Sequence, residues 1–361
     1  MLVDSLELVD FRNYEELKIT LTAGTTAILG RNGQGKTNLA EAISFLATLE
    51  SFRGAPSEAL VRRGADRAYV RADVIDDDGR RSLIECEIAR SGPSRVQVNR
   101  QRLPRTRDLL GVIRTSVFSP DDLVLVKGSP GERRRFLDTS LTALAVRNDA
   151  LRRDLDRAIR QRSVLLRQSG GRLDESTAAT LDVWDGRMAE LGDLMGTERA
   201  RLVERLEPLV IEAYSRLAGV DVSVRLDYDP EWRRSGLADA LARSRQDDLR
   251  RGVSTVGPHR DELEVELDGM PARTHASQGE QRTLALALRL AAHRLIAERV
   301  GSTPILVLDD VLSELDEGRA TALLDDLPAG QIVITSAAPL PEAARPDRVI
   351  RIADGAVTSG G

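Results

Sequence analysis

The sequence has a single cysteine, Cys86, so it can form no internal disulfide and no zinc site built on cysteines. Aromatic residues make up only 3% of the chain, which argues against binding single-stranded nucleic acid by base stacking. The longest apolar runs, such as residues 305–308, are far too short to span a bilayer, and no cationic segment with an apolar core opens the chain. We therefore expect a protein of the reducing cytoplasm with no membrane partner.

Lysine is scarce as well, because only Lys18, Lys36 and Lys127 stand among the 52 basic residues. The 57 acidic residues bring the net charge to −5, so any contact with nucleic acid must come from local patches. Hydrophobic residues at 41% and charged residues at 30% describe a globular chain and exclude general disorder. A length of 361 residues exceeds what one hydrophobic core usually covers, which predicts two domains.

Strand and helix patterns alternate at both ends of the chain. Toward the N-terminus we expect strands and then a helix at residues 6–9, 19–21, 26–29 and 38–49. Toward the C-terminus, strands alternate with helices at 262–267, 279–300, 304–309, 317–326, 331–335 and 348–352. This alternation predicts a parallel α/β sheet. Apolar and polar residues alternate over 69–103, with turn signals at 77–79 and 99–100, which predicts a small antiparallel β layer.

The middle of the chain is helical in character. Ser129 is a typical N-cap, and leucines at heptad-like spacing follow it to residue 165, interrupted at Asn148 and Arg162. After a glycine turn, a second apolar stripe covers 181–202. Two such helices should pack as an antiparallel hairpin. A helix of roughly 38 residues would reach about 55–60 Å, so we expect an arm that projects from a globular head.

These patterns predict a discontinuous organisation. We expect one α/β head formed by residues 1–118 and 253–361. A helical lobe would be inserted into it at 119–252. No internal repeat or low-complexity tract interrupts this division.

A phosphate-binding loop is predicted at residues 30–37, which fit the pattern G-x-x-x-x-G-K-[ST] between an apolar strand and a helix. Lys36 would supply a cation to the β- and γ-phosphates, and the Thr37 hydroxyl can ligate Mg²⁺. The backbone that would wrap the polyphosphate belongs to Gly30, Arg31, Asn32, Gly33, Gln34 and Gly35. With this composition a chance match is on the order of 10⁻³, so we expect binding of a nucleoside triphosphate.

Two carboxylates end an apolar run at 305–308, as expected for a metal site beside a phosphate loop. Asp309 suits coordination of Mg²⁺, and Asp310 would reach the position of a general base. An acidic loop after a buried strand is common by itself. Its pairing with the phosphate loop favours the catalytic interpretation.

A third element opens the helix expected at 279–300. Ser277 and Glu280 have the spacing of a capping box, which is a purely structural explanation. Capping alone does not require Gly279, which costs helix stability but permits close approach to a ligand. We therefore interpret the segment as a second phosphate site.

Taken with these motifs, several segments resemble the RecF family of bacterial recombination mediators, in the SMC-like group of ABC-type ATPases. The resemblance covers essentially the whole chain and rests on residues 11–14, 30–37, 118–123, 133–138, 257–261, 277–281 and 309–316. It implies an α/β fold with an ABC-type P-loop ATPase head and a small antiparallel β layer. It also implies an inserted helical lobe with an antiparallel helical hairpin arm.

The resemblance further implies a homodimer that forms on ATP binding, with each nucleotide between one subunit's phosphate loop and the other's signature segment. Ser277 would contact the γ-phosphate in trans, and Arg12 and Asn13 would lie near the adenosine. The implied partners are double-stranded and gapped DNA, RecO and RecR, and indirectly RecA, in DNA repair, replication, recombination and the SOS response. Thr335 and Ser336 stand where transporter-type heads carry a switch histidine, and no glutamine occupies the expected Q-loop position. We therefore expect weak, DNA-linked ATP hydrolysis.

A basic stretch at 90–107 contains six arginines and no carboxylate. Arginines on a β-hairpin suit DNA phosphate contacts without base readout, although an ordinary solvated face explains the stretch equally well. The arginines at 133–135 could instead neutralise Asp138. The competing functions are the ATP-binding subunit of a membrane transporter, which has a much shorter spacing from phosphate loop to signature, and a chromosome-organising SMC-like clamp, which needs a longer arm.

Overall fold

The computed structural model describes residues 1–358, which form two compact units. The first unit comprises Met1–Asp122, Ser215–Val220 and the segment from Leu286 onward, and the second comprises Leu123–Tyr214 and Asp221–Ala285. Assigning 253–285 to the head was therefore wrong. Strand β10 (Glu264–Leu267) pairs with β9 (Val224–Asp227), and these backbone hydrogen bonds tie the segment to the helical unit.

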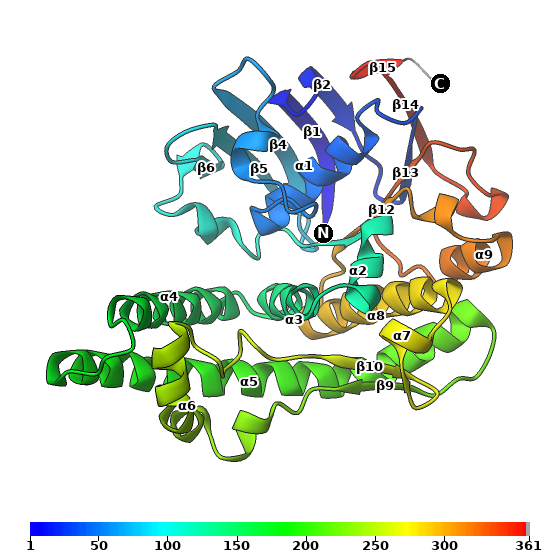
Figure 1. The fold of residues 1–361 in the computed structure, drawn as a ribbon. Coiled ribbons are helices and arrows are strands. Elements are labelled where there is room, and N and C mark those ends of the chain that lie inside the picture. The colour runs from blue at the N-terminus through cyan, green and yellow to red at the C-terminus, as the bar shows by residue number, and fades with distance from the viewer. Residues whose placement is uncertain (359–361) are drawn as a thin grey trace. The chain divides into compact units, whose positions relative to one another are not determined.

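The first unit contains two six-stranded sheets (Figure 1). One is antiparallel in the order β2-β1-β4-β5-β6-β7, with β1 (Leu2–Phe11), β2 (Tyr14–Thr20), β4 (Arg67–Ile75), β5 (Arg81–Ala89), β6 (Arg95–Val98) and β7 (Gln101–Arg102). Asn99 and Arg100, with φ of 52° and 66°, form the turn between β6 and β7. The predicted antiparallel layer is confirmed, and the two N-terminal strands belong to it as well.

The second sheet has the order β15-β14-β3-β13-β12-β8, and it is parallel from β14 to β8. Its strands are β3 (Thr25–Leu29), β8 (Thr115–Phe118), β12 (Ile305–Asp309), β13 (Ile332–Ser336), β14 (Arg348–Ala353) and β15 (Ala356–Thr358). All residues of β12 and β13 are buried, as expected for strands covered on both faces. The strands predicted around 26–29, 304–309, 331–335 and 348–352 are confirmed.

Helix α1 (Lys36–Thr48) supplies Leu39, Ile43 and Leu46 to a core that also contains side chains of both sheets. These three residues are fully buried and recur at helical spacing, so one face of the helix lies in the core. The predicted helices at 279–300 and 317–326 are α8 (Gln278–Val300) and α9 (Glu317–Asp325). The Asp316 side chain caps α9 by accepting the Arg319 N–H at 2.9 Å.

The second unit is built on α3 (Pro130–Leu144), α4 (Arg147–Gln168), α5 (Glu175–Ala218) and α6 (Leu237–Arg251). A small sheet, β9, β10 and β11 (Met270–Pro271), and the short helices α2 (Val124–Lys127) and α7 (Ala272–His275) complete it. Helices α4 and α5 lie side by side (Figure 1), joined by a turn, so the predicted hairpin is confirmed. Leu166 of α4 packs with Leu181 of α5 in one cluster near that turn.

The first helix of the hairpin is not the single helix of about 38 residues that we predicted. The chain is extended at Ala145, so α3 ends there and α4 starts anew. Asn148, one of the two interruptions of the leucine stripe, donates its Nδ2 hydrogen bond to the Leu141 carbonyl at 2.9 Å and thereby satisfies the end of α3. Ser129 stands at the N-cap of α3, but its side chain makes no capping hydrogen bond.

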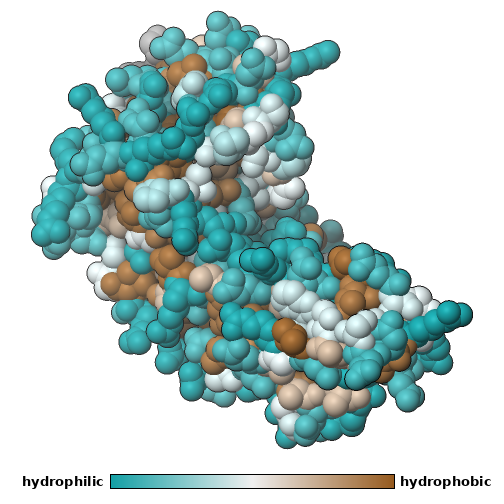
Figure 2. All heavy atoms as spheres, turned by 90° about the vertical axis from the view of Figure 1, so that its left-hand side faces the viewer, coloured by the Kyte–Doolittle hydropathy of each residue, from teal (hydrophilic) through white to brown (hydrophobic). Residues whose placement is uncertain are grey.

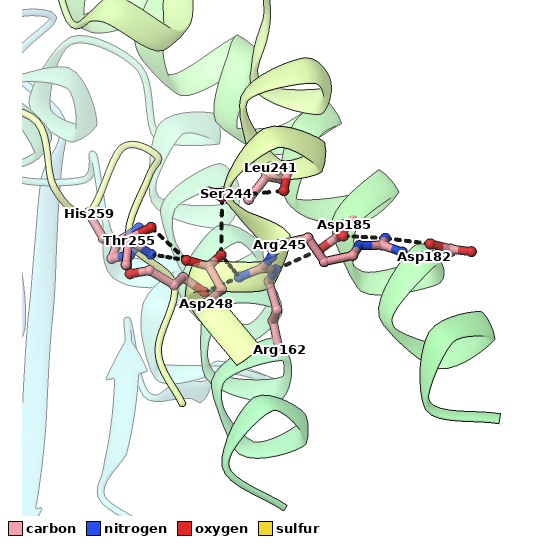
Figure 3. Close-up of polar contacts among 10 residues, drawn as sticks. Arg162, Asp182, Asp185, Leu241, Ser244, Arg245, Asp248, Thr255 and His259 are labelled. Carbon is pink, nitrogen blue, oxygen red and sulfur yellow. Dashed lines mark hydrogen bonds and ion pairs between the residues drawn. The ribbon is translucent and has the colours of Figure 1, made fainter. Parts of the chain in front are cut away.

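The other interruption, Arg162, is a fully buried ion-pair centre (Figure 3). Its guanidinium donates to Asp185 of α5 at 2.5 Å and to Asp248 of α6 at 2.6 Å. Helix α6, which the sequence did not predict, is thus joined to both helices of the hairpin. Arg245 of α6 also pairs with Asp185 at 2.6 Å, so two arginines of this cluster join the three helices.

Hydrophilic residues cover most of the face drawn in Figure 2, with hydrophobic residues exposed in small areas between them. None of the helices in residues 1–358 is both long and apolar enough to cross a membrane.

Candidate nucleotide-binding site

The phosphate loop connects β3 to α1, as predicted. Gly33 and Gly35 adopt φ of 81° and 112°, which side chains with a Cβ rarely tolerate. A Cβ on Gly30 would lie 2.4 Å from the Ile352 carbonyl oxygen of the neighbouring strand β14. Glycine is therefore required at these three positions by the backbone conformation or by the close approach of a strand.

The turn between β1 and β2 braces this loop. The Tyr14 hydroxyl donates to the Gly35 carbonyl at 2.9 Å, and Asn13 Nδ2 donates to the Gln34 carbonyl at 3.2 Å. Asn38 of α1 donates to Asn13 Oδ1 at 2.6 Å. Burial raises the pKa of Tyr14, so its hydroxyl keeps its proton for this hydrogen bond. Asn13 therefore lies at the phosphate loop, and its predicted contact with adenosine stays a prediction.

Arg12 has a structural role that the sequence did not reveal. Its Nε and one terminal nitrogen each donate to the buried carboxylate of Glu41 at 2.7 Å. The other terminal nitrogen donates to the Ala59 carbonyl at 2.9 Å. The Arg12 guanidinium thus fixes α1 to the turn between β1 and β2, because Glu41 lies on α1 and is fully buried.

Lys36 lies inside the site. Its side chain is almost fully buried, because only 3% of Lys36 is exposed. Its ammonium donates to the Arg31 carbonyl at 3.3 Å and lies 3.8 Å from Asp310 Oδ2. The phosphate loop folds back over the first turn of α1, so the backbone of this loop encloses the Lys36 side chain.

Asp309 and Thr37 lie together, as predicted for a shared magnesium site. Burial raises the pKa of Asp309, and hydrogen bonds from Thr335 and Thr37 counteract that shift. The Thr335 hydroxyl donates to Asp309 Oδ1 at 2.7 Å. A buried carboxylate beside a threonine hydroxyl is an oxygen donor set that suits Mg²⁺. The charge of Arg53 also lowers the pKa of Asp309, which places an arginine that the sequence did not single out near this carboxylate.

Asp310 is held in a left-handed conformation, with φ of 54°. Its N–H donates to the carbonyl and the hydroxyl of Thr335, both at 3.1 Å, and its Oδ1 accepts the Ala337 N–H at 3.1 Å. Thr335 thus organises both carboxylates. In the sequence, Thr335 was notable only because it stands where transporter-type heads carry a switch histidine.

The signature segment belongs to the second unit and forms the capping box that its spacing permits. The Ser277 N–H donates to Glu280 Oε2 at 2.6 Å, and the Glu280 N–H donates to Ser277 Oγ at 3.3 Å. Gln281 donates to the Ala272 and Arg273 carbonyls at 3.0 and 3.2 Å and so fixes α7 against the start of α8. The contact of Ser277 with a partner's nucleotide stays a prediction.

The arginines singled out in the sequence differ in environment. Arg90 is tied to the fold, because it donates to the carbonyls of Val61, Arg62 and Ala65. Exposed positions at the β6–β7 hairpin are Arg95, Arg100 and Arg102. Among the arginines at 133–135, Arg134 interacts with the charge of Asp138, whereas Arg133 pairs with Glu262. The hydrogen bonds to Asp138 come from Arg199, at 2.8 and 2.9 Å.

Comparison with known proteins identifies the family. The family described as the RecF/RecN/SMC N terminal domain matches residues 2–357. A DNA replication and repair protein RecF of Streptomyces avermitilis is 43% identical over 353 residues, which cover 94% of each chain. The chain belongs to the RecF family. The predicted resemblance is confirmed.

Solved structures agree with this assignment. A structure of the recombination mediator RecF with ATP, from the RecFOR pathway, has a TM-score of 0.90 at 29% identity, over 99% of this chain and 96% of that chain. An Smc head domain of Pyrococcus furiosus, 18% identical, has a TM-score of 0.57 over 98% of this chain and 94% of that chain, and it supports the fold alone. The predicted ABC-type ATPase fold with its inserted helical hairpin is confirmed.

Proposed function

We propose that this chain is an ATP-dependent DNA-binding repair protein of the cytoplasm that dimerises on ATP, recognises gapped or junction DNA and promotes RecA loading with RecO and RecR. The observation that carries the proposal is the assembly of Lys36, Thr37, Asp309 and Asp310 at one edge of the parallel sheet. It occurs in a chain that matches an ATP-bound RecF over nearly its full length. That full-length match leaves no support for a transporter subunit.

In the proposed site, residues 30–35 wrap the polyphosphate and Lys36 binds the β- and γ-phosphates. Thr37 and Asp309 would hold Mg²⁺, which when bound supplies positive charge against the phosphates. Asp309 is suited to this role because burial makes its unpaired charge unfavourable and a cation would compensate it. Asn13 and Tyr14 keep the loop in place.

We propose that hydrolysis is weak because the Asp310 carboxylate is engaged in other contacts. Its carboxylate faces the Lys36 ammonium at 3.8 Å and accepts the Ala337 N–H at 3.1 Å. Both contacts occupy carboxylate oxygens that a general base would use to take a proton from water. We propose that Asp310 is the general base and that this arrangement keeps turnover slow until a partner subunit or DNA changes it.

Dimerisation would use the signature segment in trans. Ser277 Oγ accepts a hydrogen bond from Glu280, so its own hydroxyl proton remains to be donated to a γ-phosphate. Gly279 allows a close approach beside it, and the N-terminus of α8 favours an anion. The capping box and the phosphate contact are therefore compatible roles of one serine.

Mixing two variants tests this proposal. Ser277→Arg should bind ATP but fail to dimerise, because a bulky cation fills the proposed interface, whereas Lys36→Met should fail because it lacks nucleotide. In a mixed dimer one site carries both substitutions and the other has an intact Lys36 and an intact Ser277. ATP-dependent association, measured by light scattering with gapped DNA present, should therefore return in the mixture.

Ser176→Arg is the matched control, since it places the same side chain at an exposed serine of α5. That variant should dimerise by itself. If the mixture of Ser277→Arg and Lys36→Met fails to associate while both variants are folded, the trans arrangement is refuted and Ser277 is only a capping residue.

The β6–β7 hairpin is the proposed DNA contact of the first unit. Replacing Arg95, Arg100 and Arg102 with alanine should weaken DNA binding and flatten its dependence on salt. Every arginine that binds a phosphate should, once replaced, reduce the slope of log K against log salt by about 0.9. Fluorescence titration with gapped duplex at several salt concentrations measures this slope.

A matched triple variant removes the same charge from the second unit at the exposed residues Arg205, Arg225 and Arg250. Its slope should equal that of the unmodified protein. An unaltered slope for the hairpin variant would exclude the hairpin as a DNA site.

A further inference from the structure

The segment at 257–261 matches the RecF family, but the proposed function does not use it. Most of its groups are engaged in the fold. The Pro258 carbonyl accepts the buried Arg199 at 2.7 Å. Asp261 accepts Trp232 Nε1 at 2.7 Å and also the Tyr228 hydroxyl. These contacts explain the proline and the aspartate as structural residues.

Arg260 is the exception, because its side chain is exposed. Only its Nε donates, to the Ser254 carbonyl at 3.2 Å, and its terminal nitrogens bond to no group of residues 1–358. His259 Nε2 contacts the same carbonyl at 3.1 Å. The backbone of this short loop thus orients Arg260 outward and leaves the outer part of its guanidinium available.

The loop beneath Arg260 is anchored by the buried cluster in Figure 3. Arg162 donates to the Ser254 hydroxyl at 2.8 Å and to Asp248 at 2.6 Å. Asp248 in turn accepts the N–H and the hydroxyl of Thr255 at 2.9 and 2.6 Å. The loop that carries Arg260 is therefore held in place by hydrogen bonds to the side chains of Arg162 and Asp248.

Arg260 lines an open pocket of about 460 Å³ within the second unit. Arg243 of α6 lines the same pocket and donates one hydrogen bond, to Ser235 at 2.6 Å. Apolar groups of the wall belong to Pro230, Trp232, Ala240 and Val256. Two exposed guanidinium groups thus share a pocket with a partly apolar wall.

The carboxylates of the pocket do not cancel this charge. Asp261 lies 3.8 Å from the guanidinium of the buried Arg199, and Glu262 is paired with Arg133 at 2.6 and 2.9 Å. Glu231 is the remaining carboxylate of the lining. Arg243 and Arg260 carry two positive charges against the one negative charge of Glu231, so the pocket has an excess of positive charge that favours binding of an anion.

We propose that this pocket binds an oxyanion of the phosphate type through Arg243 and Arg260. Guanidinium groups bind phosphate oxygens in pairs of hydrogen bonds, and two of them facing one pocket can hold a single phosphate firmly. The phosphate can be part of the DNA backbone, a source that rests on the proposed function, or it can be free. In the first case the helical unit carries a DNA contact additional to the β6–β7 hairpin.

The double variant Arg243→Ala, Arg260→Ala tests the site. Both residues are exposed, so the variant should fold normally, which thermal unfolding verifies. With gapped duplex, the slope of log K against log salt should fall by about 0.9 for each phosphate that the variant no longer binds. Titration with inorganic phosphate alone, followed by calorimetry, tests the free source.

The control variant Arg187→Ala, Arg201→Ala removes the same charge from exposed positions of α5 that pair only with neighbouring carboxylates. A lower slope in the pocket variant but not in the control supports a backbone phosphate. Loss of inorganic phosphate binding with an unchanged DNA slope supports a free phosphate. Equal slopes for the two variants, with unchanged phosphate binding, overturn the site. Failure of the unmodified protein to bind DNA would instead refute the proposed function.

Discussion

Lys36→Met is expected to lose most of its affinity for ATP while the protein stays folded. Lys36 is the cation enclosed by the phosphate loop, 3.8 Å from Asp310 and 3.3 Å from the Arg31 carbonyl. A hydrogen bond to a charged group contributes about 1.5–3 kcal/mol, so losing one corresponds to roughly 10- to 100-fold weaker binding. Calorimetric titration with ATP measures the dissociation constant directly.

The fold should tolerate this change. Methionine is unbranched and apolar, and the position is almost fully buried, so the side chain can occupy the same space. Lys18→Met is the matched control, because it removes one of the two other lysines from an exposed position of β2. Unchanged ATP affinity in a well-folded Lys36→Met variant would mean that the nucleotide binds elsewhere.

Arg162→Ala is expected to destabilise the second unit by about 3–5 kcal/mol, because it removes the ion-pair partner of the buried Asp248 and leaves Asp185 with Arg245 alone. The variant would contain both a buried Asp248 carboxylate without its ion-pair partner and a cavity between α4, α5 and α6. Urea unfolding followed by hydrogen exchange of amides in these helices measures the change for this unit alone. ATP binding by the phosphate loop should persist, since that loop belongs to the other unit.

Arg160→Ala on the same helix serves as the control. Arg160 is exposed, so its removal should change the stability by no more than about 0.5 kcal/mol. A small effect for Arg162→Ala as well would mean that water and the remaining partners, Arg245 and Thr255, satisfy the two carboxylates. Arg162 would then not be what holds the helices together.

The ATP site could be predicted from the sequence because its parts are local. A phosphate loop is eight adjacent residues between a strand and a helix, and its glycines are required by backbone conformation at Gly33 and Gly35. Asp309 and Asp310 follow a run of buried residues in the strand. In a parallel sheet the carboxyl ends of all strands lie at the same edge. The phosphate loop after β3 and the two aspartates at the end of β12 therefore lie at this edge, whatever path the chain takes between them. The alternation and heptad patterns likewise determined the antiparallel layer and the helical hairpin.

Tertiary structure alone decided which distant side chains complete these motifs. Thr335 organises both carboxylates, Tyr14 holds the phosphate loop, and Arg133 pairs with Glu262, yet no local spacing indicates any of these partners. The same holds for 253–285, which resembled the head in pattern but pairs with β9 in the helical unit. Periodicity reports which face of a segment is apolar, and many segments can cover that face. Only the packed fold determines which one does, because hydrogen bonds and ion pairs form between groups that packing has already brought into contact.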